Sequence, residues 1–300
     1  MKYTPAPIAI FCYKRLNLLK KLLKSLEKNK EAKLSTVFFF SDYSKNKEGL
    51  KEIEKVRKLI KNNASFKRKI IVLRNKNYGL KKNILTGIDY VFTKYKKIIV
   101  LEDDLEVSKN FLQTTNILLE KYKNKSLIST ITGYSFPNHN IREANIEKNF
   151  FLLKRPSSWG WATWKNKWIN LKKINISIEP NTKNYGNDLK IMSIKKKNGD
   201  LNSWAYDWTI KHLKSHKFCI YPKFSLIKNN GFDNHATNNF FKKKNFFYNI
   251  KSISFKNYLY QSENKKIKNL SKSNYDMNIF EFLIKFIFFK LFYEKPKNTK

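Results

Sequence analysis

The stretch that decides the fold is KKIIVLEDDLEVSKNFL, residues 96–112, in which a short apolar run ends in three consecutive carboxylates. The run at 98–101 is typical of a buried strand in an α/β sheet. Glu102, Asp103 and Asp104 follow it directly, and ligand sites in open α/β sheets lie just outside the carboxyl ends of strands. Adjacent carboxylates repel one another unless a cation lies among them, and their hard oxygen atoms suit Mn²⁺ or Mg²⁺. The alternative is an acidic loop that begins the next helix, where Asp and Glu are favoured.

Strand-like and helix-like segments alternate through about the first hundred residues. We expect strands at 8–12, 36–40, 69–73 and 98–101, with amphipathic helices between them at 16–26, 50–60 and 80–95. This alternation predicts an α/β fold with a mostly parallel, Rossmann-like central sheet flanked by helices. The chain has no Gly-x-Gly-x-x-Gly motif and no P-loop, the glycine-rich loops that bind phosphates in dehydrogenases and nucleotide triphosphatases. A divalent metal at the acidic strand could neutralise the diphosphate of a nucleotide instead. A transferase that uses a sugar nucleotide needs such a site.

The chain is strongly basic, with a formal net charge of +39 from 62 Lys and Arg against 23 Asp and Glu. Such a charge attracts nucleic acid, anionic membranes or phosphorylated substrates. Lys, Asn, Ile, Phe and Tyr are all abundant together, however, as an AT-rich coding sequence would produce without selection for binding. Lys far outnumbers Arg and no nucleic-acid-binding motif is present, so we expect no nucleic-acid partner.

Cysteine usage and apolar runs predict a cytoplasmic protein. Cys12 and Cys219 have no metal or disulfide spacing, which fits a reducing compartment. The first apolar run, at 7–13, is too short for a signal peptide, and no stretch has the length of a membrane-spanning helix. We expect one domain at 1–240, with halves at 1–133 and 134–240, and a basic, aromatic extension at 241–300.

The C-terminal extension contains a segment of a different kind, at 277–293, which is dense in Phe, Ile and Leu and includes Lys285 and Lys290. A helix of this composition can lie in the plane of an anionic bilayer, which would place the protein peripherally on the inner face of the membrane. The alternatives are a helix that packs on the domain and a dimer contact.

Six motifs together carry a resemblance to a known family. They are PIAIFCYKR (7–15), FFFSDYSKN (38–46), RNKNYGLKKNILTGIDYVF (74–92), LEDD (101–104), SSWGWATWKNKW (157–168) and WAYDW (204–208). In order and spacing the chain resembles GT-A glycosyltransferases, in particular bacterial relatives of the Golgi N-acetylglucosaminyltransferase that builds hybrid N-glycans. The resemblance covers about residues 5 to 235. It implies metal-dependent, inverting transfer of a sugar from a UDP-linked or similar donor to a surface glycan or a lipid-linked precursor.

The resemblance assigns roles to the acidic residues. It makes Asp104 the direct metal ligand, while Asp103 and Glu102 hold the ribose and sugar hydroxyls or orient the metal's waters. His235, in a late glycine-containing segment, would reach the diphosphate or the metal, since neutral imidazole is a competent ligand. The alternative for His235 is a polar loop residue without a role.

Further nucleotide contacts follow from the same resemblance. Arg15 after the first strand and Asp42 after the second lie where such enzymes hold the nucleotide. The family usually has a glycine after that aspartate, whereas this chain has Tyr43. Gly79 and Asn83 lie where the chain passes the nucleotide and donor sugar, and their alternative is a turn and helix start.

The tryptophan-rich segment at 157–168 suits a glycan, because sugar rings stack on aromatic side chains. The spacing of its tryptophans is also that of a buried helical stripe. We expect core packing for Trp164 and Trp168, and contact with the sugar or acceptor for Trp159, Gly160 and Trp161.

The resemblance makes Asp207, which directly precedes Trp208, the general base that takes the acceptor's proton. Its alternative role is pairing with one of the many lysines. Two other functions remain open for the whole chain: a nucleotidyltransferase, whose sheet and acidic site look similar, and a non-enzymatic protein that binds membranes or nucleic acid. The first usually has a glycine-rich N-terminal signature, which is absent here.

Overall fold

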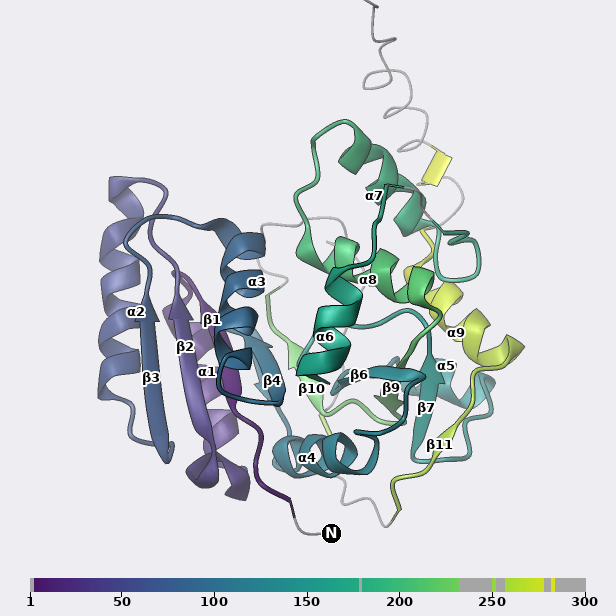
Figure 1. The fold of residues 1–300 in the computed structure, drawn as a ribbon, viewed down its shortest axis with the longest axis horizontal. Helices are drawn as coiled ribbons and strands as arrows, with labels where there is room; N and C mark the ends of the chain where they lie inside the picture. Colours follow the sequence, from purple (N-terminus) through teal and green to yellow (C-terminus); the bar gives the residue numbers. More distant parts are fainter. Residues whose placement is uncertain (1–2, 178–179, 232–249, 252–256, 278–281, 284–300) are drawn as a thin grey trace, which may run out of the picture.

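The computed structural model describes residues 3–177, 180–231, 250–251, 257–277 and 282–283. Within them, one nine-stranded sheet has the order β11-β7-β9-β6-β8-β4-β1-β2-β3, and helices cover both of its faces (Figure 1). A separate two-stranded antiparallel ladder joins β5 (Leu105–Val107) to β10 (Ile227–Asn229). The α/β class expected from the sequence is confirmed.

The first half of the chain forms the parallel part of the sheet. Its elements are β1 (Ile8–Cys12), α1 (Leu16–Glu27), the short 3-10 helix η1 (Lys30–Leu34), β2 (Thr36–Ser41), the 3-10 helix η2 (Lys47–Gly49), α2 (Leu50–Asn62), β3 (Arg68–Leu73), α3 (Gly79–Phe92) and β4 (Lys97–Glu102). Every strand and helix expected in this half is present. Pairing is parallel from β4 to β1, from β1 to β2 and from β2 to β3.

Alternating side chains of these strands face two different layers. Ile8 and Ile10 of β1 pack with α1, α2 and α4 (Phe111–Lys121), whereas Ala9 and Phe11 pack with α3. The crossover helices therefore change face between the β1-β2-β3 unit and β4. Such a reversal opens a crevice at the carboxyl ends of the two central strands, which are β1 and β4 here.

The second half continues the same sheet with mixed pairing. Its strands are β6 (Ile128–Thr132), β7 (Phe150–Leu153), β8 (Trp161–Trp164), β9 (Phe218–Pro222) and β11 (Tyr260–Gln261). Its helices are α5 (Asn138–Glu143), α6 (Lys165–Lys172), α7 (Asp188–Lys197), α8 (Trp204–Ser215) and α9 (Lys265–Tyr275). β8 joins the two halves, because it pairs antiparallel with both β4 and β6.

The helical stripe predicted for the four tryptophans at 157–168 is wrong for three of them. Trp159 lies in the bend before β8. Trp161 and Trp164 lie on the strand β8, where residues three apart face opposite sides. Trp161 packs with α3 and α8, and Trp164 packs on the other face with α4. Only Trp168, on α6, is helical as expected.

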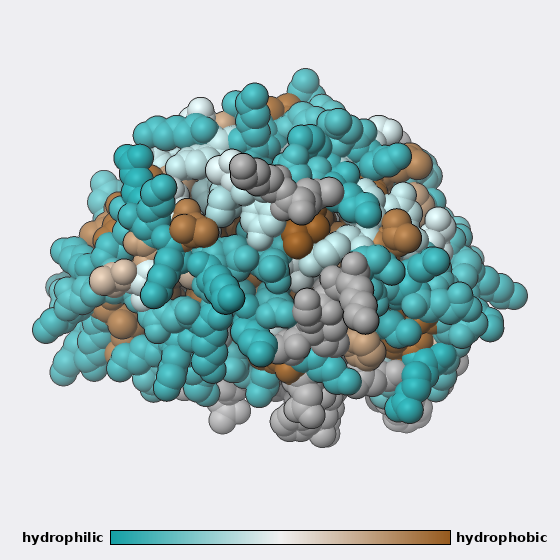
Figure 2. All heavy atoms as spheres, turned by 90° about the horizontal axis from the view of Figure 1, so that it is seen from below, coloured by the Kyte–Doolittle hydropathy of each residue, from teal (hydrophilic) through white to brown (hydrophobic). Residues whose placement is uncertain are grey.

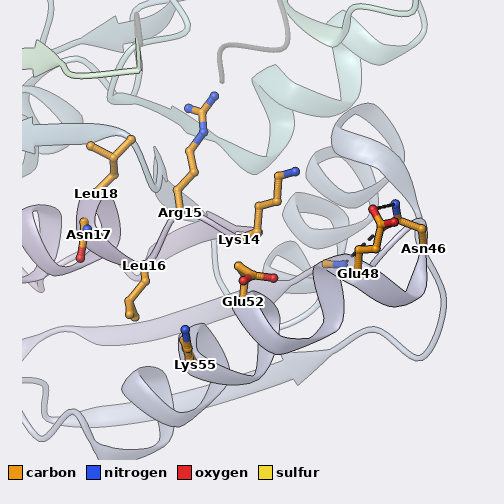
Figure 3. A pocket seen from close by; sticks show the side chains of 10 residues that line it. Lys14, Arg15, Leu16, Asn17, Leu18, Asn46, Glu48, Glu52 and Lys55 are labelled. Carbon is orange, nitrogen blue, oxygen red and sulfur yellow. Dashed lines mark hydrogen bonds between the residues drawn. The ribbon is translucent and has the colours of Figure 1, made fainter. Parts of the chain in front are cut away.

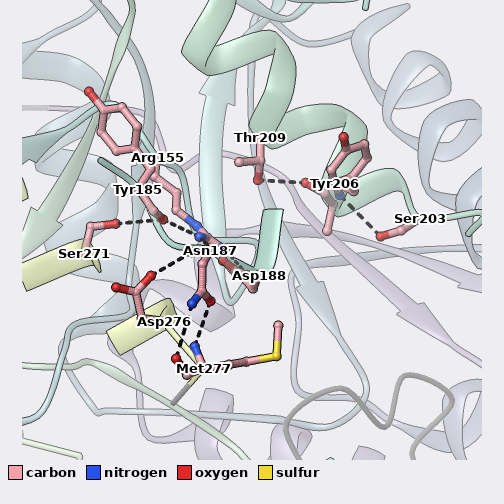
Figure 4. A network of polar contacts seen from close by, with 11 residues as sticks. Arg155, Tyr185, Asn187, Asp188, Ser203, Tyr206, Thr209, Ser271, Asp276 and Met277 are labelled. Atoms are coloured by element: carbon pink, nitrogen blue, oxygen red, sulfur yellow. Dashed lines mark hydrogen bonds and ion pairs between the residues drawn. The ribbon is translucent and has the colours of Figure 1, made fainter. Parts of the chain in front are cut away.

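Part of the expected C-terminal extension packs on the second half of the sheet. β11 pairs with β7, and α9 contacts β7 and α5. Buried Arg155 donates two hydrogen bonds to buried Asp188, at 2.8 and 2.7 Å (Figure 4). The guanidinium of Arg155 also stacks on the ring of Tyr275 at the end of α9. Asp276 accepts a 2.7 Å hydrogen bond from the backbone of Asn187. α9 is thereby tied to the start of α7.

Most of the segment at 277–293 lies outside the described residues, so its expected membrane contact stays a prediction. Among the residues that the structure describes, no helix is long and apolar enough to cross a bilayer. The face seen from below in Figure 2 is hydrophilic over most of its described area, with hydrophobic residues in small separate groups.

One buried histidine makes stability depend on pH. His212 of α8 is fully buried, its ring nitrogens lie 3.2 Å from Ser129 Oγ and 3.5 Å from Thr130 Oγ1, and its ring meets that of Trp208 edge-on. Loss of hydration lowers the pKa of His212 from 6.5 to about 3. The folded protein therefore keeps this ring neutral at pH values where the unfolded chain binds a proton.

We expect this difference to destabilise the fold as the pH falls from 6.5 towards 3, by up to about 1.4 kcal/mol per pH unit. Chemical denaturation at a series of pH values measures the slope. His212→Asn should remove this contribution, whereas His216→Asn, at the exposed histidine that ends the same helix, should keep it. Equal slopes in both variants would contradict the assignment.

Candidate active site

The carboxyl ends of β1 and β4 bring two opposite charges together. Arg15 directly precedes α1, and Asp104 follows β4 by two residues. Arg15 Nη1 lies 2.9 Å from Asp104 Oδ2, and each side chain is 18% exposed. Two of the residues predicted to bind the donor or its metal, Arg15 and Asp104, thus meet at the crevice between the central strands. Both are mostly buried but keep exposed surface that a ligand can reach.

Asp103 is the most buried member of the acidic triplet, whereas Glu102 and Asp104 are both partly exposed. Asp103 is buried and accepts a 2.9 Å hydrogen bond from the backbone of Tyr13, which fixes the loop after β1. Loss of hydration raises the pKa of Glu102 and of Asp103, and the charge of Asp104 raises both further, while Arg15 opposes the shift. The three carboxylates therefore form a site that a cation would stabilise.

The surroundings of Asp104 fit a divalent metal that a substrate helps to hold. The described residues contain no group of three His, Cys, Asp or Glu side chains able to hold an ion by themselves. Mg²⁺ is commonly bound by one or two carboxylates together with substrate phosphates. Asp104 can supply such a carboxylate. Gly231 packs directly against its carboxylate, and a Cβ atom there would collide with Oδ2. His235 lies outside the described residues.

Gly231 reaches this position through the ladder between β5 and β10. The backbone of Asn230 donates a 2.8 Å hydrogen bond to the carbonyl of Asp104, directly beyond that ladder. The sequence indicated a glycine in this late segment, but its contact with Asp104 depends on a pairing between segments more than a hundred residues apart.

Asp42 shapes the loops at the end of β2. Its Oδ1 accepts hydrogen bonds from the backbone of Tyr43 at 2.9 Å and of Tyr78 at 2.8 Å. Tyr43 does not have the positive φ that would require the glycine usual in the family. Tyrosine is therefore compatible with this loop, and Asp42 links it to the segment that begins α3.

Gly79 and Asn83 both lie at the start of α3, but Asn83 binds other residues of the protein rather than facing solvent. It is buried, and its Oδ1 accepts a 2.9 Å hydrogen bond from Arg74 Nε. The Arg74 guanidinium lies 4.5 Å from the ring centroid of Tyr78. The sequence analysis did not select Arg74 as a candidate site residue. Its position directly after β3, at the same edge of the sheet as Arg15 and Asp42, could have indicated it.

Asp207 lies in the first turn of α8, with both carboxylate oxygens held by lysines. Lys81 Nζ of α3 is 2.6 Å from its Oδ2, and Lys196 Nζ of α7 contacts its Oδ1. The pairing considered as its alternative role is therefore present. Asp207 is thereby linked to the first turn of α3, close in sequence to Tyr78, whose backbone donates a hydrogen bond to Asp42. Both lysines were missed because the sequence offers so many.

The loop before β8 contacts protein more than solvent. Trp159 is half-buried and meets Tyr134 edge-on, with ring centroids 4.8 Å apart. Gly160 has φ +57°, and a Cβ atom there would lie 2.5 Å from Ile227 Cδ1. Trp161 is 1% exposed and packs among the core tryptophans, so its burial does not support the expected sugar contact. Trp159 keeps exposed surface.

A cavity of about 530 Å³ adjoins Arg15 on the side of α1 and α2 (Figure 3). Its charged and polar lining includes Lys14, Arg15, Asn46, Glu48, Glu52 and Lys55. Arg15 thus belongs both to this cavity and to the ion pair with Asp104.

Comparison with known proteins assigns the chain to a family. The family model described as Glycosyl transferase family 2 matches residues 8–179. The chain therefore belongs to this family and has the GT-A fold. This assignment favours the glycosyltransferase interpretation over the nucleotidyltransferase and non-enzymatic ones. No curated protein matches the chain closely enough to be a relative.

Solved structures of similar fold are distant in sequence. The mannosyltransferase PcManGT from Pyrobaculum calidifontis, with GDP-Man and Mn²⁺, is 13% identical (59% of this chain, 50% of that one, TM-score 0.43). S. aureus TarS 1-349, with UDP-GlcNAc, is 10% identical (74% and 57%, TM-score 0.44). GalNAc-T7, with UDP, GalNAc and Mn²⁺, is 12% identical (76% and 44%, TM-score 0.49). The chain spans about half the length of these structures.

The contact between Gly160 and Ile227 yields a stability prediction. Gly160→Ala should destabilise the fold by about 2–4 kcal/mol, because the left-handed conformation and the close packing are both unfavourable for alanine. Gly199→Ala is the matched control, since Gly199 has φ +84° but open space around its Cβ position, and should cost only about 1–2 kcal/mol. Urea denaturation measures both, and equal losses would show that the contact with Ile227 is unimportant.

Proposed function

We propose that the protein transfers a sugar from a nucleotide-sugar donor, of the UDP-linked class, to a hydroxyl group of a surface glycan or lipid-linked precursor. The observation that carries this proposal is the ion pair between Arg15 and Asp104 at the crevice between β1 and β4. It places a carboxylate suited to Mn²⁺ or Mg²⁺ beside a guanidinium suited to a diphosphate. Membership of family 2 supports the same reaction class.

Different residues of this crevice would bind the metal, the diphosphate and the sugar hydroxyls of the donor. Asp104 would hold the metal, and Arg15 would turn from Asp104 to the diphosphate. A bound divalent cation neutralises the leaving diphosphate. Asp42, Asp103 and Glu102 border the same edge, where their carboxylates would position ribose or sugar hydroxyls.

Asp207 would serve as the general base. The acceptor oxygen attacks the anomeric carbon from the face opposite the diphosphate, the bond to the phosphate oxygen breaks, and the hydroxyl proton passes to Asp207. One such displacement inverts the anomeric configuration. Asp207 is 15% exposed and lies next to the donor edge through Lys81, which supports its access to the acceptor.

Asp104→Asn tests the metal site with little change in volume. Calorimetry with Mn²⁺ should show UDP-sugar affinity reduced at least about tenfold, because the amide is a poor metal ligand beside a diphosphate. Chelator should weaken binding in the wild type and have little further effect in the variant. Asp89→Asn, which removes a carboxylate paired with exposed Lys172, should leave affinity unchanged. Binding to no nucleotide sugar, with or without metal, would contradict the proposal.

Asp207→Asn tests the base without requiring the acceptor, because water can accept the sugar slowly. We expect donor affinity to persist while hydrolysis of the UDP-sugar falls by about 10²-fold or more. Proton NMR of the first product formed should show the anomer opposite to that of the donor. Retained configuration would exclude a single displacement, and an unchanged rate in the variant would remove Asp207 from the mechanism.

A further inference from the structure

Two ammonium groups from different helices hold the same carboxylate. Lys81 of α3 and Lys196 of α7 bind the two separate oxygens of Asp207, which itself belongs to α8. Both lysine side chains are about one-third exposed, at 32% and 30%, so they are sheltered but open to a ligand. The pairing joins three helices at one point of the surface.

A third lysine belongs to the same group. Lys211 follows Asp207 by one helical turn, which places the two side chains on the same face of α8. Lys211 Nζ donates a 2.6 Å hydrogen bond to the backbone carbonyl of Lys172, a neutral acceptor that leaves its charge uncompensated. Burial lowers the pKa of Lys211, which Asp207 opposes and the charges of Lys172, Lys196 and Lys81 support.

The charges of this group do not balance. Lys81, Lys196 and Lys211 set three positive charges against the single negative charge of Asp207, while Lys172 has its own partner in Asp89. The proposed base also has both oxygens engaged by ammonium groups. An incoming anion would reduce the repulsion and compete for the lysines.

We propose that Lys81, Lys196 and Lys211 form a site for a phosphate group of the acceptor, close to the hydroxyl that receives the sugar. Binding of this phosphate draws the lysines from Asp207 and leaves a carboxylate oxygen for the hydroxyl proton. The inference rests on the proposed function, since it names the class of acceptor for the same reaction: a phosphate-bearing glycan or lipid-linked precursor.

The donor's diphosphate is the other source of the same chemistry. In the proposed function that group is bound by Arg15 and by the metal that Asp104 holds, at the ends of β1 and β4. The lysines approach from α3, α7 and α8. A variant of Arg15 therefore separates the two anion sites.

Calorimetry with inorganic phosphate, in chelator and at constant ionic strength, tests the site. We expect Lys196→Gln/Lys211→Gln to weaken phosphate binding at least about tenfold, because it removes two of the three charges. Lys94→Gln/Lys197→Gln is the matched control: Lys94 lies exposed beyond α3 and Lys197 lies exposed beside Lys196, so the same charge is lost away from the site. The control and Arg15→Gln should each stay within about twofold of the wild type.

Several results would overturn the site: no phosphate binding by the wild type, equal losses in both double variants, or loss only in Arg15→Gln. The same variants titrated with UDP-sugar and Mn²⁺ separate this failure from failure of the function. Nucleotide-sugar binding that persists in Lys196→Gln/Lys211→Gln leaves the donor site intact whatever the phosphate result. Phosphate binding at the lysines without any nucleotide-sugar binding would refute the proposed function and, with it, the acceptor role.

Discussion

The change of crossover direction between β1 and β4 is the constraint on which the site depends. α1 and α2 pack on one face of the sheet and α3 on the other, so none of these three helices covers the carboxyl ends of the two central strands. Side chains that follow these strands must then meet at one edge. Arg15 and Asp104 do so, and their ion pair keeps opposite charges together where a metal and a diphosphate can replace them.

Both proposed functional carboxylates are held by basic side chains in the same way. Asp104 is paired with Arg15, and Asp207 with Lys81 and Lys196. All these side chains keep 15–32% exposure, so water competes for each pair and lowers its net contribution to stability. Exchange of a protein cation for a metal, or of a protein anion for a phosphate, therefore costs little. The buried pair of Arg155 and Asp188 differs, because no solvent competes for it and it serves to fix α9.

The sequence alone predicted the first half well, because its strands and helices are local patterns. The strand at Ile8–Cys12 agrees to the residue, and the acidic strand agrees to within one residue at each end. The second half depends on pairing between distant segments. β8 lies between β4 and β6, so Trp161 and Trp164 became strand residues despite their helical spacing. The lysine partners of Asp207 could not be selected from 62 basic residues without their positions in space.

The most direct test of this account is a crystal structure with UDP and Mn²⁺. The account predicts the ion within about 2.0–2.2 Å of an Asp104 carboxylate oxygen and of diphosphate oxygens, with Arg15 turned from Asp104 to the diphosphate. A nucleotide bound in the cavity beside Glu52, with the pair of Arg15 and Asp104 intact and no ion at Asp104, would contradict it.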